Sequence, residues 1–168
     1  VTPQLFNQVS VVMLDFVDFT EFATKTDPTV TLAELNDIFT AFDRIVEQYG
    51  CERIKTIGDA YLAVSGMPDP APEHASAVAH CAVRFLRYLE RRNESHQHTW
   101  RARIGLGTGA AVGSVVGIQK YVYDVFGPAV NTSSRLQMMA DPMGIVAPEE
   151  MKFDLIDEFQ ITDFSEHQ

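Results

Sequence analysis

The sequence predicts an α+β fold with a ferredoxin-like core, in which the elements follow the order β-α-β-β-α-β. Strand-like and helix-like segments alternate in this order over the first two-thirds of the 168 residues. The apolar share of 46% and the charged share of 21% are typical of a globular protein with a buried core. We expect a mixed, mainly antiparallel sheet, followed by additional C-terminal α/β elements.

The first strand and the first long helix have the clearest patterns. Residues 9–16, VSVVMLDF, are apolar and β-branched, which is typical of a buried strand. A helix is expected from Thr31 to Tyr49, because Thr31 and Glu34 have the spacing of a capping box and apolar residues follow at helical spacing. Gly50 is suited to end this helix.

The remaining elements complete the core and extend it. Gly58 and Asp59 are typical residues of a tight turn between two strands. Three prolines in the stretch that follows exclude a regular element there. In chain order, the expected elements are strands 52–57 and 60–65, a helix from 73 to 92, strands 101–109, 110–117 and 121–127, a helix 128–139, a strand near 145, a helix 148–155 and a strand 159–164.

The charge balance restricts the possible ligands. With 13 Lys and Arg against 23 Asp and Glu, the net charge is −10. A nucleic-acid groove needs a basic face, so nucleic acid is not expected as a partner. An acidic protein can still bind a phosphorylated small molecule when metal ions and a few local cations neutralise the phosphates.

Other features indicate a cytoplasmic domain of a longer protein. Cys51 and Cys81 have neither metal-ligand spacing nor a disulfide framework, so reduced and partly buried thiols are expected. No apolar run is long enough for a membrane span or a signal peptide, so we expect no membrane contact by this domain. The chain begins at Val1 rather than methionine. His96 and His98 lie in a polar stretch and are expected to be solvated.

Two aspartates stand at strand ends. Asp15 closes the first strand, and Asp59 lies in the turn between the second and third. Strands one and three are neighbours in a β-α-β-β-α-β sheet, so the two carboxylates can converge into a Mg²⁺ site. A helix beginning at Phe19 and Thr20 adds backbone N–H groups suited to phosphate. The residues alone leave a second interpretation open, in which Asp15 caps that helix and Asp59 only turns the hairpin.

Four stretches together resemble the class III nucleotidyl cyclase catalytic domain in order and spacing. They are LDFVDFT, IKTIGDAYLAVSG, RIGLGTG and YDVFGPAVNTSSRL. The resemblance covers nearly the whole chain, so residues 1–168 are expected to form a single catalytic domain. It implies that a ribose 3′-oxygen attacks its own α-phosphate, which gives a 3′,5′-cyclic nucleotide and pyrophosphate.

The resemblance also implies a role for individual residues. Two divalent cations, Mg²⁺ or Mn²⁺, are expected as cofactors, because the family binds metal through residues that match positions here. The implied roles are metal binding by Asp15, Asp59 and the carbonyl of Phe16; contact with the base by Lys55 and Asp124; contact with the terminal phosphates by Arg103; orientation of the ribose by Asn131; and stabilisation of the transition state by Arg135.

The two residues at the base positions favour ATP. Lys55 can donate to N1 of adenine, and Asp124 can accept from its N6 amino group. Guanine has the opposite polarity, and family members that use GTP resemble this chain but have a glutamate and commonly a cysteine at these positions. The expected activity is therefore adenylate cyclase.

The resemblance further implies a head-to-tail homodimer with two equivalent sites. Lys55 and Asp59 would serve opposite ends of one nucleotide, and family members divide these duties between two subunits. An upstream regulatory domain is expected in the full-length protein, which can be membrane-attached.

The chain departs from the family pattern at two places. It ends at Gln168, before the C-terminal strand pair that carries a lysine in the family, so this strand pair is expected to be truncated. Asp18 stands where the family often has a small residue. Two alternatives stay open: a catalytically silent cyclase-like domain that binds nucleotide or dimerises for regulation, and a guanylate cyclase with unusual base-contacting residues.

Overall fold

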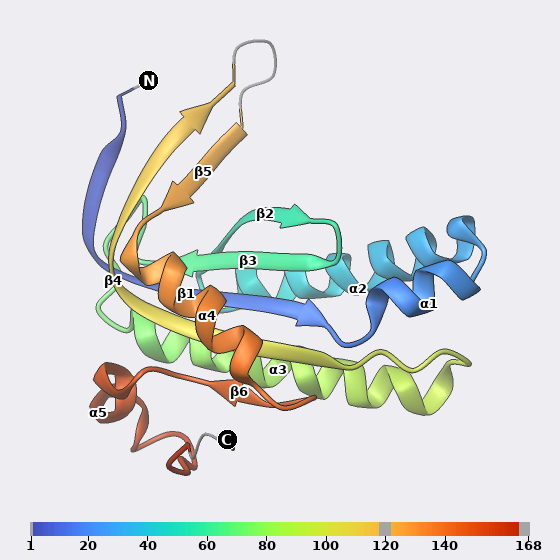
Figure 1. Ribbon diagram of the computed structural model, residues 1–168. Coiled ribbons are helices and arrows are strands. Elements are labelled where there is room, and N and C mark those ends of the chain that lie inside the picture. The colour runs from blue at the N-terminus through green and yellow to red at the C-terminus, as the bar shows by residue number, and fades with distance from the viewer. Residues whose placement is uncertain (1, 118–121, 165–168) are drawn as a thin grey trace.

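The computed structural model describes residues 2–117 and 122–164, which form a six-stranded sheet (Figure 1). Its strands are β1 (Gln4–Phe16), β2 (Glu52–Ile57), β3 (Ala60–Ser65), β4 (Ala102–Val116), β5 (Val122–Phe126) and β6 (Ile145–Val146). The strand order is β2-β3-β1-β4-β5 with antiparallel neighbours, and β6 pairs with β4 in parallel. This order confirms the ferredoxin-like core and the mixed, mainly antiparallel sheet.

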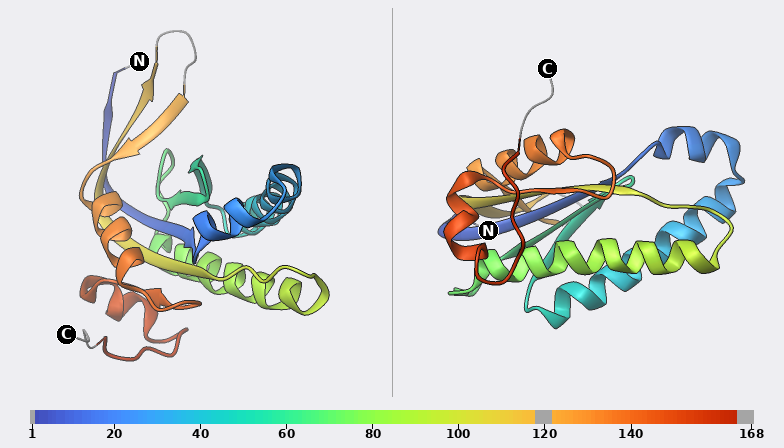
Figure 2. Two further views of the ribbon diagram at one scale, coloured as in Figure 1. Left: turned by 45° about the vertical axis from the view of Figure 1, so that its right-hand side comes forward. Right: turned by 90° about the horizontal axis from the view of Figure 1, so that it is seen from below.

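Helices cover both faces of the sheet. They are α1 (Phe19–Lys25), α2 (Pro28–Gln48), α3 (His74–Ser95), α4 (Pro128–Met139), the 3₁₀ turn η1 (Glu149–Met151) and α5 (Lys152–Leu155). Figure 2 shows α4 on the face opposite α3. The alternation along β1 explains both layers: Val12 and Leu14 pack into the core with α2 and α3, whereas Val9 and Val11 pack with Ala129 of α4.

Aromatic rings fill the space between α2, α3 and the sheet. The ring centroids of Phe42 and Phe85 lie 4.3 Å apart, and both rings contact Tyr61 of β3. All three side chains are fully buried. Burial of each contributes about 2–3 kcal/mol to the free energy of unfolding. The Tyr61 hydroxyl donates to Asp43 at 2.7 Å, so its burial leaves no unsatisfied polar atom.

The start of the long helix differs from the prediction. The helix α2 begins at Pro28, and the Asp27 side chain accepts a hydrogen bond from the Thr29 N–H at 2.8 Å. Thr31 lies inside the helix, so the predicted capping box with Glu34 was wrong. A proline at the first helical position and an aspartate before it are together a sufficient start signal, because proline fixes a helical φ. Gly50 ends the helix at a φ of 68°, as predicted.

Three predicted strands also differ from the structure. One continuous strand, β4, spans most of the stretches 101–109 and 110–117, and Gly109 lies within it at a φ of 125°, where the register with β1 shifts between Phe6 and Val9. Residues 159–164 form no strand. Instead, the Phe159 N–H donates to the Leu155 carbonyl and extends the last helical turn. An alternating pattern becomes a strand only where a neighbouring strand takes its hydrogen bonds.

Helix α4 lies unusually close to β4. A Cβ atom at Gly105 would overlap the Ser133 carbonyl and the Gln137 N–H group, and one at Gly107 would overlap the Ala129 carbonyl. The Ser133 hydroxyl donates to the Gly105 carbonyl at 2.7 Å. The glycines therefore fix the depth at which α4 sits on the sheet.

Candidate functional site

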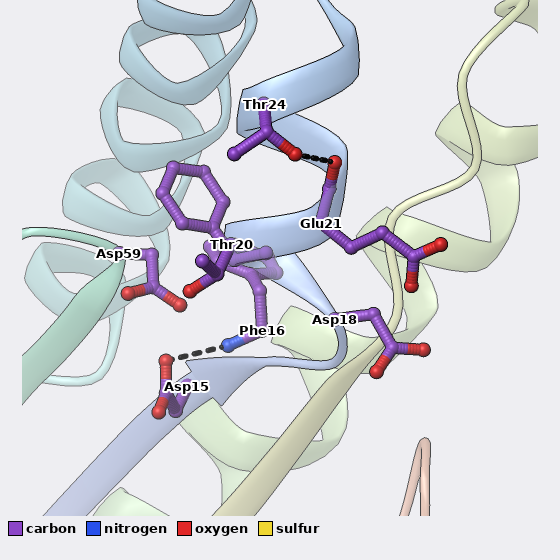
Figure 3. A pocket seen from close by; sticks show the side chains of 8 residues that line it. Asp15, Phe16, Asp18, Thr20, Glu21, Thr24 and Asp59 are labelled. Carbon is purple, nitrogen blue, oxygen red and sulfur yellow. Dashed lines mark hydrogen bonds between the residues drawn. The ribbon is translucent and has the colours of Figure 1, made fainter.

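An acidic pocket opens where β1 ends, beside the β2–β3 turn and the start of α1 (Figure 3). It has a volume of about 570 Å³. Its lining residues are Asp15, Phe16, Asp18, Phe19, Thr20, Glu21, Thr24 and Asp59. Carboxylates dominate this lining, so the pocket attracts cations rather than free anions.

Asp15 and Asp59 converge in this pocket, as the strand order predicts. β1 pairs with β3 from Ser10 opposite Ser65 to Leu14 opposite Tyr61, so the end of β1 meets the turn before β3. Figure 3 shows the two carboxyl groups turned towards one another. Partial burial, and then the hydrogen bond and charge of Asp15, raise the pKa of Asp59 to about 7.

The alternative role of Asp15 as a helix cap was wrong. The N-cap residue of α1 is Asp18, and one carboxylate oxygen of Asp15 accepts from the Phe16 N–H at 2.9 Å. The other oxygen remains available to the pocket. Asp59 does occupy the hairpin turn, so it has both the turn position and the pocket position.

Helix α1 starts at Phe19, as expected, and directs its first turn at the pocket. Its first N–H groups, including those of Phe19 and Thr20, have no acceptor within the helix. Asp18 precedes them in the left-handed conformation, with φ 58° and ψ 30°. Aspartate is one of the few non-glycine residues that adopt this conformation readily, so Asp18 is compatible with it.

A second charged group lies away from the acidic pocket. Lys55 of β2 and Asp124 of β5 form an ion pair in which Nζ and Oδ2 are 2.8 Å apart. Their side chains are 28% and 15% exposed, so both charges are partly withdrawn from water. The other Asp124 oxygen accepts from the Val125 N–H at 2.8 Å. Lys55 is thus paired with Asp124, and the neighbour of Asp59 is Asp15.

The remaining candidate residues occupy β4 and α4. Arg103 is the register partner of Asp15 in the β1–β4 ladder, so it lies beside the acidic pocket. Asn131 and Arg135 are exposed and one helical turn apart on α4, whereas Ala129, Ser133 and Gln137 of that helix are buried. Within residues 2–117 and 122–164, Arg103 and Arg135 form no salt bridge.

The candidate residues therefore form separate groups. The structure brings Asp15, Phe16, Phe19, Thr20 and Asp59 together around one pocket. It brings Lys55 and Asp124 together elsewhere, and neither of them lines that pocket, nor do Asn131 and Arg135.

Two pocket residues were not predicted from the sequence, and the prediction for one histidine was wrong. Glu21 and Thr24 line the pocket because residues 19–25 form a helix of their own. The Asp27-Pro28 pair, a start signal for the next helix, could have revealed this division. His98, expected to be solvated, is half-buried and its Nδ1 lies 2.8 Å from a Glu34 oxygen.

The donor set in the acidic pocket fits a hard divalent cation. Among the described residues, no three or more His, Cys, Asp or Glu side chains gather around one point. A cation at Asp15 and Asp59 would complete its shell with the Phe16 carbonyl, water and ligand oxygens, which is how Mg²⁺ is usually bound. The raised pKa of Asp59 agrees with this, because two facing carboxylates gain most from a shared cation.

No helix within the described part of the chain combines the length and apolar character that a membrane span requires.

Comparisons with known proteins agree on one family. The family described as the adenylate and guanylate cyclase catalytic domain matches residues 1–167. An adenylate cyclase of Mycobacterium tuberculosis is 37% identical over 154 residues, which cover 92% of this chain and 35% of that protein. The receptor-type guanylate cyclase gcy-14 of Caenorhabditis elegans is 40% identical over 145 residues, which cover 84% of this chain and 13% of that protein.

Solved structures share the fold. The catalytic core of a rhodopsin-guanylyl cyclase with converted specificity, in complex with ATPαS, has a TM-score of 0.88 and 27% identity, and the match covers 99% of this chain and 91% of that one. This chain spans about a third of the length of the mycobacterial relative. The matched family, the extent of the match and the mixed α+β fold agree, and the chain belongs to the class III adenylate and guanylate cyclase catalytic domains.

Proposed function

We propose that this domain converts ATP to 3′,5′-cyclic AMP and pyrophosphate, at sites shared by two copies of the chain. The observation that carries the choice of ATP is the Lys55–Asp124 pair, with Nζ and Oδ2 2.8 Å apart. It presents one donor and one acceptor side by side. N1 of adenine accepts a hydrogen bond and its N6 amino group donates one, so Lys55 and Asp124 can bind both.

The Lys55–Asp124 pair discriminates between adenine and guanine because both of its charges are partly buried. A base of the wrong polarity leaves Lys55 and Asp124 facing a donor and an acceptor that they cannot satisfy. Guanine presents a donor at N1 and an acceptor at O6. The partial withdrawal of both charges from water increases the cost of that mismatch.

The acidic pocket is the proposed metal and phosphate site. Asp15, Asp59 and the carbonyl of Phe16 would hold two divalent cations, Mg²⁺ or Mn²⁺. Cations bound there would lower the pKa of the ribose 3′-hydroxyl and neutralise the triphosphate. The backbone N–H groups of Phe19 and Thr20 supply hydrogen bonds to phosphate oxygens.

Three further side chains complete the proposed chemistry. Arg103, beside Asp15 in the β1–β4 ladder, would contact the terminal phosphates. Asn131 would hydrogen-bond the ribose and orient its 3′-oxygen for in-line attack. Arg135 would donate two parallel hydrogen bonds to the equatorial oxygens of the α-phosphate as charge develops there.

The division into two groups supports a head-to-tail homodimer. The acidic pocket of one copy would receive Lys55, Asp124, Asn131 and Arg135 from the other, and two-fold symmetry then gives two equivalent sites. Large apolar side chains are exposed near those residues. They are Ile57 at 58% exposure, Tyr123 at 38%, Phe126 at 48% and Met138 at 69%.

We further propose that residues 1–168 act as one catalytic domain, placed in the cytoplasm and driven by an upstream regulatory domain. A guanylate cyclase is the second candidate, because gcy-14 is 40% identical to this chain. A catalytically silent domain is the third. The presence of Asp15, Asp59, Asn131 and Arg135 in one chain opposes that last possibility.

Product formation from ATP and from GTP, each with Mn²⁺ and with Mg²⁺, tests the proposal. Asp59→Asn is the control, since it keeps the turn and removes one charge. Cyclic AMP from ATP, little product from GTP and a loss of activity in the variant are expected. Cyclic GMP as the main product would favour the second candidate, and the absence of product from both nucleotides in the wild type would favour the third.

A further inference from the structure

Trp100, the only tryptophan of the chain, lies against both sides of the turn that carries the acidic pocket. Its ring centroid is 5.0 Å from that of Phe16 at the end of β1. It is 6.0 Å from Phe19 and 4.9 Å from Phe22, both in α1. Trp100 is 4% exposed, so this one side chain packs beneath the backbone that forms the pocket.

Trp100 is itself held by groups of α2 and α3. Its indole Nε1 donates to Glu34 at 3.3 Å, and its backbone N–H and carbonyl both bond to the Asn93 amide at 2.9 Å. Glu34 also accepts from Arg92 at 3.3 Å and contacts His98 at 2.8 Å. Arg92 is 4% exposed, and a buried pair of this kind resists displacement because each charge depends on the other.

Helix α1 has little else to fix it. None of its seven residues is fully buried. Its partly buried rings, Phe19 and Phe22, both pack on Trp100, and Phe22 also packs on His98, whose Nδ1 lies 2.8 Å from Glu34. The rigid elements α2 and α3 therefore set the position of α1 largely through this indole ring.

We propose that Trp100 is a positioning residue for the metal and phosphate pocket, and that it acts through Phe16 and Phe19. Trp100 fixes the direction of the Phe16 carbonyl and of the first N–H groups of α1, and Glu34 fixes Trp100. This inference rests on the proposed function, because it concerns the same pocket. Outer-shell groups that hydrogen-bond to metal ligands typically change metal affinity by about 10- to 100-fold when replaced, and ring packing on Phe16 and Phe19 is expected to act at the lower end of that range.

The test measures Mn²⁺ binding directly, by the paramagnetic resonance signal of free Mn²⁺, beside kcat and thermal unfolding. Trp100→Leu removes the aromatic contacts and the N–H donor, and it should weaken Mn²⁺ binding about tenfold. Trp100→Phe keeps a ring in place and should restore the affinity to within about threefold of wild type. Phe85→Leu is the matched control, since Phe85 is a fully buried aromatic residue packed on Phe42 and Tyr61.

The positioning role predicts that both leucine variants lower the melting temperature but that only Trp100→Leu weakens Mn²⁺ binding. A merely structural role predicts that both variants change Mn²⁺ binding to the same extent. Glu34→Gln leaves the Trp100 ring in place and takes the place of Trp100→Leu in the test if that variant does not fold. It should also weaken Mn²⁺ binding. In the wild type, Mn²⁺ should quench the Trp100 fluorescence, and Asp15→Asn should abolish this quenching.

The outcomes separate the two proposals. A wild type that binds Mn²⁺ while the Trp100 and Glu34 variants bind it equally well overturns the positioning role alone. The same holds if Phe85→Leu weakens Mn²⁺ binding as much as Trp100→Leu. A wild type that neither binds Mn²⁺ nor forms a cyclic nucleotide overturns the proposed function, and the positioning role with it.

Discussion

Lys55 and Asp124 come from the two edge strands of the main sheet, β2 and β5, yet their side chains form an ion pair of 2.8 Å. The sheet must therefore curl until its edges approach each other. Lys55 and Asp124 are 69 positions apart in the chain, so no local sequence pattern predicts that they form a pair. Under the proposed function, an entering base replaces this ion pair with hydrogen bonds of its own, so these two side chains determine the choice of substrate.

Reversing the polarity of the pair should reverse the substrate preference. In Lys55→Glu combined with Asp124→Cys, the ratio of kcat/KM for ATP to that for GTP should fall by about 100-fold or more, because the site then offers an acceptor to N1 of guanine. The measurement is initial rates with each nucleotide under Mn²⁺. Arg53→Glu on the same strand is the control, since Arg53 forms an exposed pair with Asp43. An unchanged ratio in the double variant would contradict the assignment of the base site.

Two inactive variants should restore activity when they are mixed. Asp59→Asn removes a proposed metal ligand and Arg135→Ala removes a proposed catalytic side chain of α4, so each variant alone should be inactive. Random pairing gives mixed dimers with one intact site, and the mixture should recover about a quarter of wild-type activity. The measurement is cyclase activity as a function of the mixing ratio of the two variants. Asp59→Asn mixed with Asp15→Asn, which damage the same group, should recover nothing. Recovery in that control, or none in the first mixture, would oppose a shared site.

The raised pKa of Asp59 predicts how stability depends on pH without metal. The ordinary pKa of 3.8 becomes about 7 in the folded protein, so the folded state holds this proton more tightly than the unfolded chain. This group therefore makes the protein less stable as pH rises from about 4 to about 7. Asp59→Asn removes the effect and should raise the melting temperature at pH 8 in a metal chelator.

At pH 5 the difference between the melting temperatures of Asp59→Asn and wild type should be smaller, because the wild-type group is then protonated in the folded state. Addition of Mn²⁺ at pH 8 should stabilise the wild type more than the variant. A variant that is less stable than wild type at pH 8 in chelator would contradict the close approach of the two carboxylates.

Adding a single methyl group at Gly105 should displace α4. The new Cβ atom would overlap backbone atoms of Ser133 and Gln137, which cannot move as a flexible side chain would. Gly105→Ala should cost about 1–3 kcal/mol of stability and should also lower kcat, because Asn131 and Arg135 move with the helix. Ser133→Ala, which removes only the 2.7 Å hydrogen bond to Gly105, should cost about 1 kcal/mol. Wild-type kcat in Gly105→Ala would show that the depth of α4 is not critical.

Sequence reasoning predicted the convergence of Asp15 and Asp59 because it depends on topology alone. A β-α-β-β-α-β order places strand one beside strand three, and the structure pairs β1 with β3. The end of α2 at Gly50 was also predictable, since few residues other than glycine adopt a φ of 68° readily.

Other features could not be predicted locally. Thr31 and Glu34 have the spacing of a helix start, but Glu34 contacts Arg92, His98 and Trp100 far along the chain. Its partners are set by the packing of α2 on α3, which no short pattern encodes. Residues 159–164 alternate as a strand does, yet they have no strand neighbour in the described structure. Patterns that need a distant partner remain ambiguous until the fold supplies it.

Because α1 carries no fully buried side chain, its local unfolding should require less free energy than unfolding of the sheet. The amide hydrogens of residues 19–25 would then exchange with solvent through brief openings of this one segment, while those of β1 exchange only on global unfolding. Under the proposed function, the phosphate end of the site would thus open to release pyrophosphate without disturbing the strands that hold the two aspartates. The weak attachment of this one short helix would thus allow turnover while the rest of the fold stays intact.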